Sequence, residues 1–363
     1  MPNYATLRNE TEFNWYVSGS YTPLIELTET PMKEFYLDPS AGIHVYREGR
    51  KLLREIYPED VTMPSPLTPP ISYGHINCLG AELVFPDKGE VNYKVLCNSL
   101  EQGIEILEHE IDFATAGMMP FYLKYYEKLQ QSFPEEPVGF GFKGEGPITT
   151  AYILRGEEFF LDPFDNPELT KKFLGMLTES IVKFKYFGSK LSGMRPGKLP
   201  EAGLTDDIAA MFAPGCWNEF IMPFLERFFT GLTDGKRSAH IEDLKAEHLK
   251  FLEQLNLSYY DPSVSPHLTP EIVGTESSVP FGWRLCDFHY RDMTNSDVEN
   301  FVFKAAAGGA SLVLSSIGHN MLTPEMVGKV HSFINAGKEA KKMLDNGVER
   351  QELLKLCSKT EKE

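Results

Sequence analysis

The chain has 363 residues, of which 42% are hydrophobic and 24% are charged, so it can bury a substantial core. Its formal net charge of −17 disfavours nucleic acids and anionic membranes as partners. No apolar run approaches the roughly 20 residues of a membrane-spanning helix, and the first residues lack the basic-then-apolar order of a secretory signal. Five scattered cysteines without a CxxC pair indicate free thiols and a cytoplasmic protein.

The first part of the chain, residues 1–70, is predicted to be an N-terminal extension. It contains one helix from about Ile43 to Ile56 and then a proline-rich connector, MPSPLTPP, which cannot continue a helix or a central strand. The main domain is expected to span residues 71–345. Residues 346–363 form a charged tail that is expected to fray.

Strand-like and helix-like segments alternate from Pro137 onward. The expected strands include GFGFKG, RSAHI, LSYYD, VPFGWRL and ASLVLSSIG, and amphipathic segments separate them. Such alternation predicts a parallel sheet with right-handed crossovers, in a barrel or in an open doubly wound sheet. No GxGxxG or GxxxxGK[ST] motif follows a strand, and polar residues gather after strands. We therefore predict an α/β fold, a (β/α)8 TIM barrel with an N-terminal helical extension.

Three helix starts are marked by capping signals. Thr269 and Thr323 are each followed by Pro and Glu, which predicts a threonine cap with proline at the first helical position. The run Ser296-Asp-Val-Glu299 predicts a capping box.

A group of candidate metal ligands stands at the ends of two predicted strands. His240 and Glu242 are two residues apart, so in a strand their side chains point to the same side. His319 follows the last apolar strand after a glycine. Two histidines and a carboxylate suit an open zinc site, with Cys286 as a substitute or fourth ligand. Alternatively, Glu242 caps the next helix, His319 is a hydrogen-bonded structural residue, and Cys286 is buried packing.

A second group of polar residues carries acids and one base. Glu201, Asp206 and Asp207 suit binding of a polar substrate or general acid/base work. Their alternative role is to form an acidic helix N-terminus. Lys143 and Glu145 lie in a glycine-lined turn that either binds substrate or is a plain loop.

Aromatic residues occupy further strand ends. Tyr259, Tyr260 and Trp283 either wall an apolar ligand or form layers of the barrel core. Asp261 and Arg284 lie beside them in the sequence, and no role follows for either from the sequence.

Four blocks of the chain, in order from about Pro137 to the last helix, resemble the uroporphyrinogen decarboxylase superfamily. They are GEGPITTAYILRGEEFFLDPFDNPE, GLTDDIAAMFAPGCWNEFIMPFLERFF, HIEDLKAEHLKFLEQLNLSYYDPS and LSSIGHNMLTPE. The second block has Ala-Pro-Gly-Cys where the superfamily has Ser-Pro-Glu, and the first 130 residues match only loosely. The resemblance implies the barrel fold.

The superfamily includes metal-free decarboxylases and corrinoid-dependent methyltransferases. The RQAGRY arginine motif of the decarboxylases does not occur here. The zinc ligands of the methyltransferases, carried over by position, become His240, Glu242 and His319, with both thiolates missing. Glutamate and imidazole leave zinc more electron-poor than thiolates do, so it is a better Lewis acid toward oxygen.

The resemblance therefore implies a methyltransferase of the aromatic O-demethylase kind. It would move a methyl group from a methoxylated, aromatic compound to the cobalt of a corrinoid (cobalamin) protein. Glu201, Asp206, Asp207 and Glu145 would position substrate or manage protons, and Tyr259, Tyr260, Trp283 and Lys143 would bind it. Two alternatives remain, a metal-free decarboxylase acting on another substrate and a non-catalytic ligand-binding barrel. The expected partners are a corrinoid protein and a small-molecule substrate. The chain itself could form a homodimer.

Overall fold

The computed structural model describes residues 2–57 and 60–357, which form two compact units. Unit 1 consists of the described parts of Met1–Glu29, Val45–Pro64 and Ala239–Glu363. Unit 2 consists of Thr30–His44 and Ser65–Ser238. Strand β6 (Thr233–His240) begins in unit 2, and its last two residues belong to unit 1.

Unit 1 combines a parallel sheet with helices that follow its strands. Its strands are β1 (Asn14–Gly19), β2 (Val61–Thr62), β7 (Tyr259–Asp261), β8 (Gly282–Leu285) and β9 (Leu312–Ile317). Its α-helices are α1 (Leu7–Glu10), α2 (Thr22–Leu27), α5 (Arg50–Ile56), α14 (Lys250–Gln254), α15 (Pro270–Glu276), α16 (Asn295–Ala307) and α17 (Pro324–Asp345). Shorter turns are η1 (Val45–Gly49), η5 (Ala246–His248), η6 (Asp287–Asp292) and η7 (Arg350–Leu356).

The sheet of unit 1 has the strand order β2-β1-β9-β8, and every pair is parallel. A parallel bridge between Tyr260 and Phe281 brings β7 beside β8. The register aligns Tyr16 of β1 with Leu314 of β9, and Leu314 with Arg284 of β8. Because parallel strands end at the same edge, the residues that follow these strands gather at one edge of unit 1.

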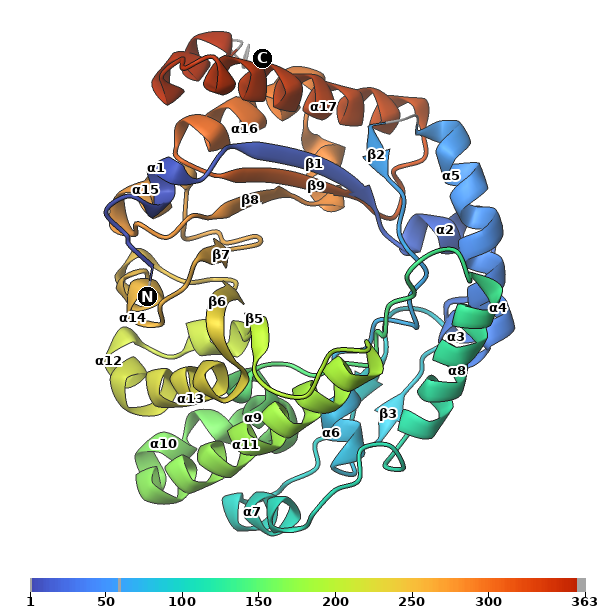
Figure 1. Cartoon of the computed structure of the whole chain (residues 1–363), viewed down its shortest axis with the longest axis vertical. Coiled ribbons are helices and arrows are strands. Elements are labelled where there is room, and N and C mark those ends of the chain that lie inside the picture. Colours follow the sequence, from blue (N-terminus) through green and yellow to red (C-terminus); the bar gives the residue numbers. More distant parts are fainter. Residues whose placement is uncertain (1, 58–59, 358–363) are drawn as a thin grey trace. The chain divides into compact units, whose positions relative to one another are not determined.

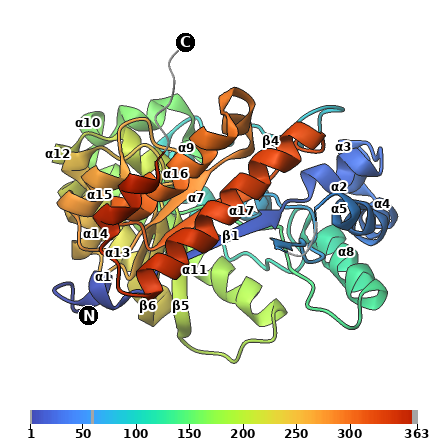
Figure 2. The ribbon, with the colours of Figure 1, turned by 90° about the horizontal axis from the view of Figure 1, so that it is seen from above.

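Helices cover one face of this sheet, and Figures 1 and 2 show α16 and α17 running along it. Val17, Ser315 and Leu285 point to this face and are at most 1% exposed. Trp15 packs where α17 carries Gly337, since a Cβ there would lie 2.6 Å from Trp15 Cγ. The hydroxyls of Tyr290 and Ser315 are 2.8 Å apart, which satisfies both groups in the interior.

The N-terminal seventy residues, predicted as an extension, contribute β1 and β2 to this sheet. The helix expected from Ile43 to Ile56 is present as the end of α4 (Pro39–His44), then η1 and α5. The expectation that the tail frays is wrong for residues 350–356. There Leu353 is fully buried, and Arg350 donates to the carbonyl oxygens of Ala306 and Ala310 over 2.6 and 2.9 Å. Residues 358–363 of this tail lie outside the described residues.

Unit 2 is rich in helices. Its helices are α3 (Met32–Leu37), α4, α6 (Gly74–Cys78), α7 (Leu100–Glu108), α8 (Met119–Ser132), α9 (Pro147–Arg155), α10 (Asp162–Asp165), α11 (Pro167–Leu191), α12 (Pro214–Cys216) and α13 (Met222–Leu232). Its short turns are η2 (Glu157–Phe160), η3 (Asp207–Met211) and η4 (Trp217–Ile221). Besides β6, its strands are β3 (Leu83–Val84), β4 (Asn92–Tyr93) and β5 (Leu199–Thr205).

Two parallel bridges, Leu67 to Gly139 and Ile71 to Phe142, mark extended segments of unit 2 that are not regular strands. The second segment continues to Gly146, whose N–H donates to Thr205 O at the end of β5. In the apolar region ISYGHINCLGAELVF, Gly74–Cys78 is helical, and Leu83–Val84 forms a strand that pairs antiparallel with β4.

The threonine caps of α15 and α17 are confirmed, because Thr269 and Thr323 accept from the N–H groups of Ile272 and Met326. The capping box predicted at Ser296–Glu299 is wrong by two residues. Thr294 is the cap of α16 and exchanges hydrogen bonds with Asp297. The run TNSDVE holds two overlapping capping patterns, and the helix begins at the earlier one.

All five cysteines are free thiols, as predicted. Within residues 2–57 and 60–357, no helix combines the length and the hydrophobicity needed to cross a bilayer.

We predict that Gly337→Ala lowers the free energy of unfolding by about 1 kcal/mol. Overpacking against Trp15 costs ~1–3 kcal/mol, and the gain in helix propensity returns up to ~1 kcal/mol. Gly328→Ala in the same helix is the matched control. A Cβ there meets no atom within 4 Å, so this variant should be stabilised by ~0.5–1 kcal/mol. Urea unfolding measures both, and equal stabilisation of the two variants would contradict the packing.

The corrected helix start predicts that Thr294→Ala destabilises the protein by about 1 kcal/mol, because the cap of α16 is lost. Ser296→Ala lies inside the helix and should change stability by less than ~0.5 kcal/mol. Thermal unfolding of the two variants checks this. A larger loss for the Ser296 variant would restore the box read from the sequence.

Candidate active site

The alternation of side chains along the strands of unit 1 decides which residues face away from the helices. Val17, Ser315 and Leu285 point to the helices, so Tyr16, Leu314 and Arg284, one residue earlier in each strand, point to the opposite face. We call this the helix-free face. It is less buried than the helix-covered face, and Tyr16 is 40% exposed.

The same alternation extends to β7 and to the end of β6. Tyr260 is fully buried, so its neighbours Tyr259 and Asp261 point to the opposite side of β7. Ala239 and Ile241 are almost fully buried, which leaves His240 on the other side of β6. Parallel strand ends thus bring together side chains that are far apart in the sequence.

Asp261 is the centre of this group. Its Oδ2 lies 3.1 Å from His240 Nδ1 and accepts from Arg284 Nη2 over 2.6 Å. Its Oδ1 accepts from the N–H of Ser263 over 2.8 Å. Burial alone would raise the pKa of Asp261, but the hydrogen bond to His240 and the positive charge of Arg284 outweigh it and lower the pKa to about 2. Asp261 is therefore ionised at neutral pH.

An ionised Asp261 fixes the tautomer of His240. A carboxylate only accepts, so Nδ1 of His240 must carry the proton that is shared with Asp261. Nε2 then faces Glu242, with 3.6 Å between Nε2 and Oε1. The hydrogen bond to His240 lowers the pKa of Glu242 although burial opposes it, so Glu242 is also anionic. Each ring nitrogen of His240 thus faces a carboxylate oxygen.

Tyr259 and Tyr16 flank the charged group as neutral phenols. Burial raises the pKa of both hydroxyls; the Asp261 charge raises that of Tyr259 further, whereas the Arg284 charge opposes the rise for Tyr16. Gly282 has no side chain, and this leaves room for the Tyr259 hydroxyl beside β8.

Two of the aromatic residues predicted to bind substrate lie elsewhere, so these predictions are wrong. Tyr260 is fully buried and donates to Ile241 O over 3.0 Å, which makes it part of the core. Trp283 alternates with Arg284 and so lies on the helix-covered side, with its ring edge-on to Phe281. A sequence alone does not say which of two adjacent aromatics faces the interior, because both strand parities are apolar.

His319, the third predicted metal ligand, has a different partner. Its side chain is 52% exposed, and its Nδ1 is 3.9 Å from Glu26 Oε2. The turn after β9 explains this position, since Gly318 leaves no room for a Cβ beside Asp287 and Asn320 has a positive φ of 59°.

The donor set does not fit zinc. In residues 2–57 and 60–357, no group of three or more His, Cys, Asp or Glu side chains is arranged to hold a metal ion. The strongest acceptor near His240 is Asp261, which is already neutralised by the permanent charge of Arg284. A divalent cation beside that guanidinium would be repelled. Burial also raises the pKa of the Cys286 thiol to about 11, so the thiolate that a metal needs is disfavoured.

In unit 2, Asp206 is a buried cap of α9. Its carboxylate accepts from the N–H groups of Ile148 and Thr149 over 3.1 and 2.6 Å. Gly146 is required beside it, because a Cβ there would lie 2.5 Å from Asp206 Oδ2. Burial raises the pKa of Asp206 to about 7; the two backbone hydrogen bonds oppose this, and the charge of Glu145 adds to it.

Of the other acidic residues predicted to act in the site, two lie near Asp206 and one lies far from it. Glu145 is close enough to Asp206 to influence its ionisation, and Asp207 begins η3 next to it. Glu201 is exposed near the start of β5, roughly 16 Å from Asp206 along an extended strand, so its grouping with the aspartates is wrong. Lys143 is exposed in the segment before α9.

Sequence reasoning missed roles for Asp261 and Arg284. Along its strand, each of these two residues alternates with neighbours that face the opposite side, and each lies two residues from another polar residue. This alternation was the signal in the sequence. The face on which the two side chains lie became clear only from the pairing of β7, β8 and β9.

Comparison with known proteins supports the fold. No family model and no curated protein matches the sequence. A methyltransferase from Methanosarcina mazei is similar in structure, with a TM-score of 0.62 and 15% sequence identity. The match covers 93% of this chain and 97% of that chain. The chain thus has the fold of that protein, and the predicted fold class, an α/β barrel with parallel strands, is confirmed.

The buried Asp206 predicts a pH dependence of stability. Its pKa is raised on folding, so the protonated carboxyl stabilises the fold, and this contribution is lost as the pH rises from about 4 toward 7. In Asp206→Asn the side chain cannot ionise. We expect the stability of the natural protein relative to this variant to fall between about pH 5 and about pH 7.5, a range that spans the titration of Asp206.

Urea unfolding at several pH values measures this difference. Glu145→Gln is the matched control, because removal of its charge should lower the pKa of Asp206 and move the loss of stability to lower pH. A relative stability independent of pH would contradict a buried, titrating Asp206.

Proposed function

We propose that this chain is the methyltransferase component of an O-demethylase of the uroporphyrinogen decarboxylase superfamily. It would take the methyl group of a methoxylated aromatic compound and pass it to a corrinoid carried by a partner protein in the cytoplasm. Two findings support the proposal, the fold shared with a methyltransferase and the ordered blocks that resemble the superfamily. The observation that carries the chemistry is the His240–Asp261–Arg284 network on the helix-free face.

The chemical difficulty of O-demethylation lies in the leaving group. A phenolate is a poor leaving group, so the ether oxygen needs a proton or another electrophile while its bond to the methyl carbon breaks. The bound corrinoid would supply the cobalt nucleophile that accepts the methyl group. The electron pair of the carbon–oxygen bond stays on oxygen, which takes up one proton and becomes a phenol.

His240 suits the role of proton donor. Asp261 holds Nδ1 and stabilises the imidazolium, so the proton to be released sits on Nε2. Arg284 keeps Asp261 ionised and fixes its orientation. After the transfer, neutral imidazole remains hydrogen-bonded to Asp261, and Glu242 favours the return of a proton from solvent.

The phenol rings of Tyr16 and Tyr259 supply apolar surface on the same face, next to a fixed positive charge. This suits an aromatic donor whose oxygen faces His240. Zinc has no part in the proposal, because the donor set around His240 does not fit it.

The proposal predicts that His240→Asn lowers the rate of methyl transfer about 100-fold or more, since general acid catalysis contributes roughly that factor. Asp261→Asn should lower it at least about tenfold through loss of the correct tautomer. His267→Asn, an exposed histidine of unit 1, is the matched control and should leave the rate unchanged. The assay mixes the protein with a reduced corrinoid protein and follows the methylcobalamin spectrum.

A panel of donors separates proton donation from a structural role. With an anisole whose ring carries strongly electron-withdrawing groups, the oxygen leaves without a proton, so the effect of His240→Asn should shrink toward unity. An equal loss for all donors would contradict the role of His240 as an acid. Release of carbon dioxide from a carboxylated substrate, without methyl transfer, would favour the decarboxylase alternative.

A further inference from the structure

Unit 2 contains a cavity that the proposed chemistry does not use. Its volume is about 380 Å³, and it lies where the C-terminal turns of α11 face the segment 139–144. Its lining residues are Leu67, Gly139, Phe140, Phe142, Lys143, Gly144, Phe184, Lys185, Phe187, Gly188, Ser189 and Ser192. The size falls in the range of small-molecule sites, about 300–1,000 Å³.

Two glycines that line the cavity pack closely against their neighbours. A Cβ at Gly139 would lie 2.6 Å from Leu67 Cδ1, and one at Gly144 would lie 2.7 Å from His75 Cβ. Gly188 of α11 is different, because a Cβ there would meet no atom within 4 Å. The space beside Gly188 is therefore unfilled and can be filled by mutation without a clash.

Two ammonium groups line the cavity. Lys185 Nζ donates to Gly144 O over 3.2 Å, which uses one of its three hydrogens. Burial lowers the pKa of Lys185; Glu145 opposes the shift, and Lys143 adds to it, so the two lysines repel each other. An anion between them would relieve that repulsion.

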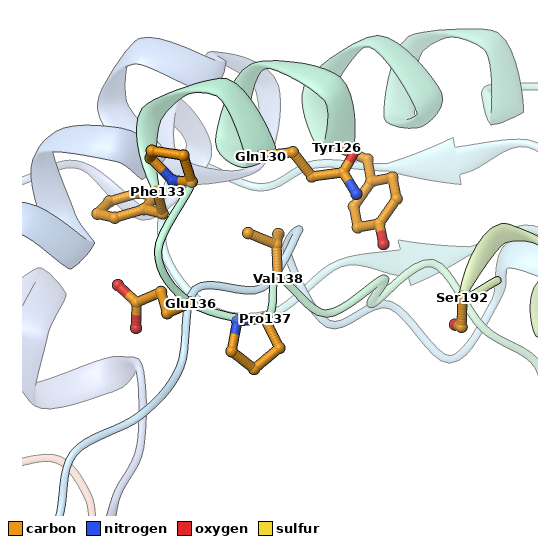
Figure 3. A pocket seen from close by; sticks show the side chains of 8 residues that line it. Tyr126, Gln130, Phe133, Glu136, Pro137, Val138 and Ser192 are labelled. Carbon is orange, nitrogen blue, oxygen red and sulfur yellow. The ribbon is translucent and has the colours of Figure 1, made fainter.

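The neighbouring pocket gives a contrast. It also measures about 380 Å³, shares Ser192, and is lined by Tyr126, Gln130, Phe133, Pro134, Glu136, Pro137 and Val138. Figure 3 shows its side chains, with the carboxylate of Glu136 and no cationic group among them. The cavity beside α11 is thus the one of this pair that is basic and walled by phenylalanines.

We propose that this cavity binds a small aromatic carboxylate. The carboxylate lies between Lys143 and Lys185, and the ring packs against the half-buried rings of Phe140 and Phe187. Charge selects the anion and the phenylalanine walls select a planar ring. The site is independent of the proposed methyl transfer, since none of its residues takes part in the His240 network.

Isothermal titration of the full chain with benzoate, which has no methoxy group for the proposed transfer, tests the proposal. We expect saturable binding, at least tenfold weaker binding of the uncharged benzamide, and no measurable binding of acetate. Lys185→Met and Lys143→Met should each weaken binding of benzoate at least tenfold. Lys190→Met, an exposed lysine of α11 outside the cavity, is the matched control and should bind like the natural protein.

Gly188→Leu is a second variant that should block the cavity without unfolding the protein. Its side chain enters unfilled space, so we expect an unchanged or higher melting temperature together with loss of binding. Binding that survives in Gly188→Leu, or equal binding of the benzamide, would overturn the proposal. His240→Asn should retain binding here, so a failure of methyl transfer and a failure of this site give different results.

Discussion

The candidate active site depends on one carboxylate. Asp261 bonds to His240 through one oxygen, shares that oxygen with Arg284, and accepts a backbone N–H on the other. Burial raises the pKa of this carboxyl, and its hydrogen bonds and the charge of Arg284 together outweigh burial, so it stays ionised. Its charge fixes the proton of His240 on Nδ1 and leaves Nε2 for chemistry. Removal of Asp261 would leave a guanidinium and an imidazole without the anion that holds both.

Strand parity determines which residues can join this network. Register pairs Tyr16, Leu314 and Arg284 in one row on the helix-free face, and the next row packs under α16 and α17. Tyr259 and Tyr260 are neighbours in the sequence, but Tyr259 lies beside Asp261 and Tyr260 lies in the core. The same constraint fills the helix-covered face with close contacts such as Trp15 against Gly337. The candidate site and the close packing under the helices therefore occupy opposite sides of one sheet.

Features with a local cause could be predicted from the sequence. The alternation of strands and helices, the threonine caps of α15 and α17, and the exit of His240 from a strand all follow from short-range patterns. Features with a long-range cause could not. Asp206 caps a helix that starts almost sixty residues earlier, and Asp261 meets His240 only because β6 and β7 end together. The misfit of the donor set to zinc has the same cause, since spacing showed two ligand-like side chains but not the arginine that neutralises their neighbour.

The most direct test of the central claim is nitrogen NMR of the His240 imidazole at a pH where the ring is neutral. Asp261 as an obligate acceptor predicts a proton on Nδ1 and an unprotonated Nε2, and the preference should disappear in Asp261→Asn. A neutral ring with its proton on Nε2 in the natural protein would contradict the network on which the proposed chemistry rests.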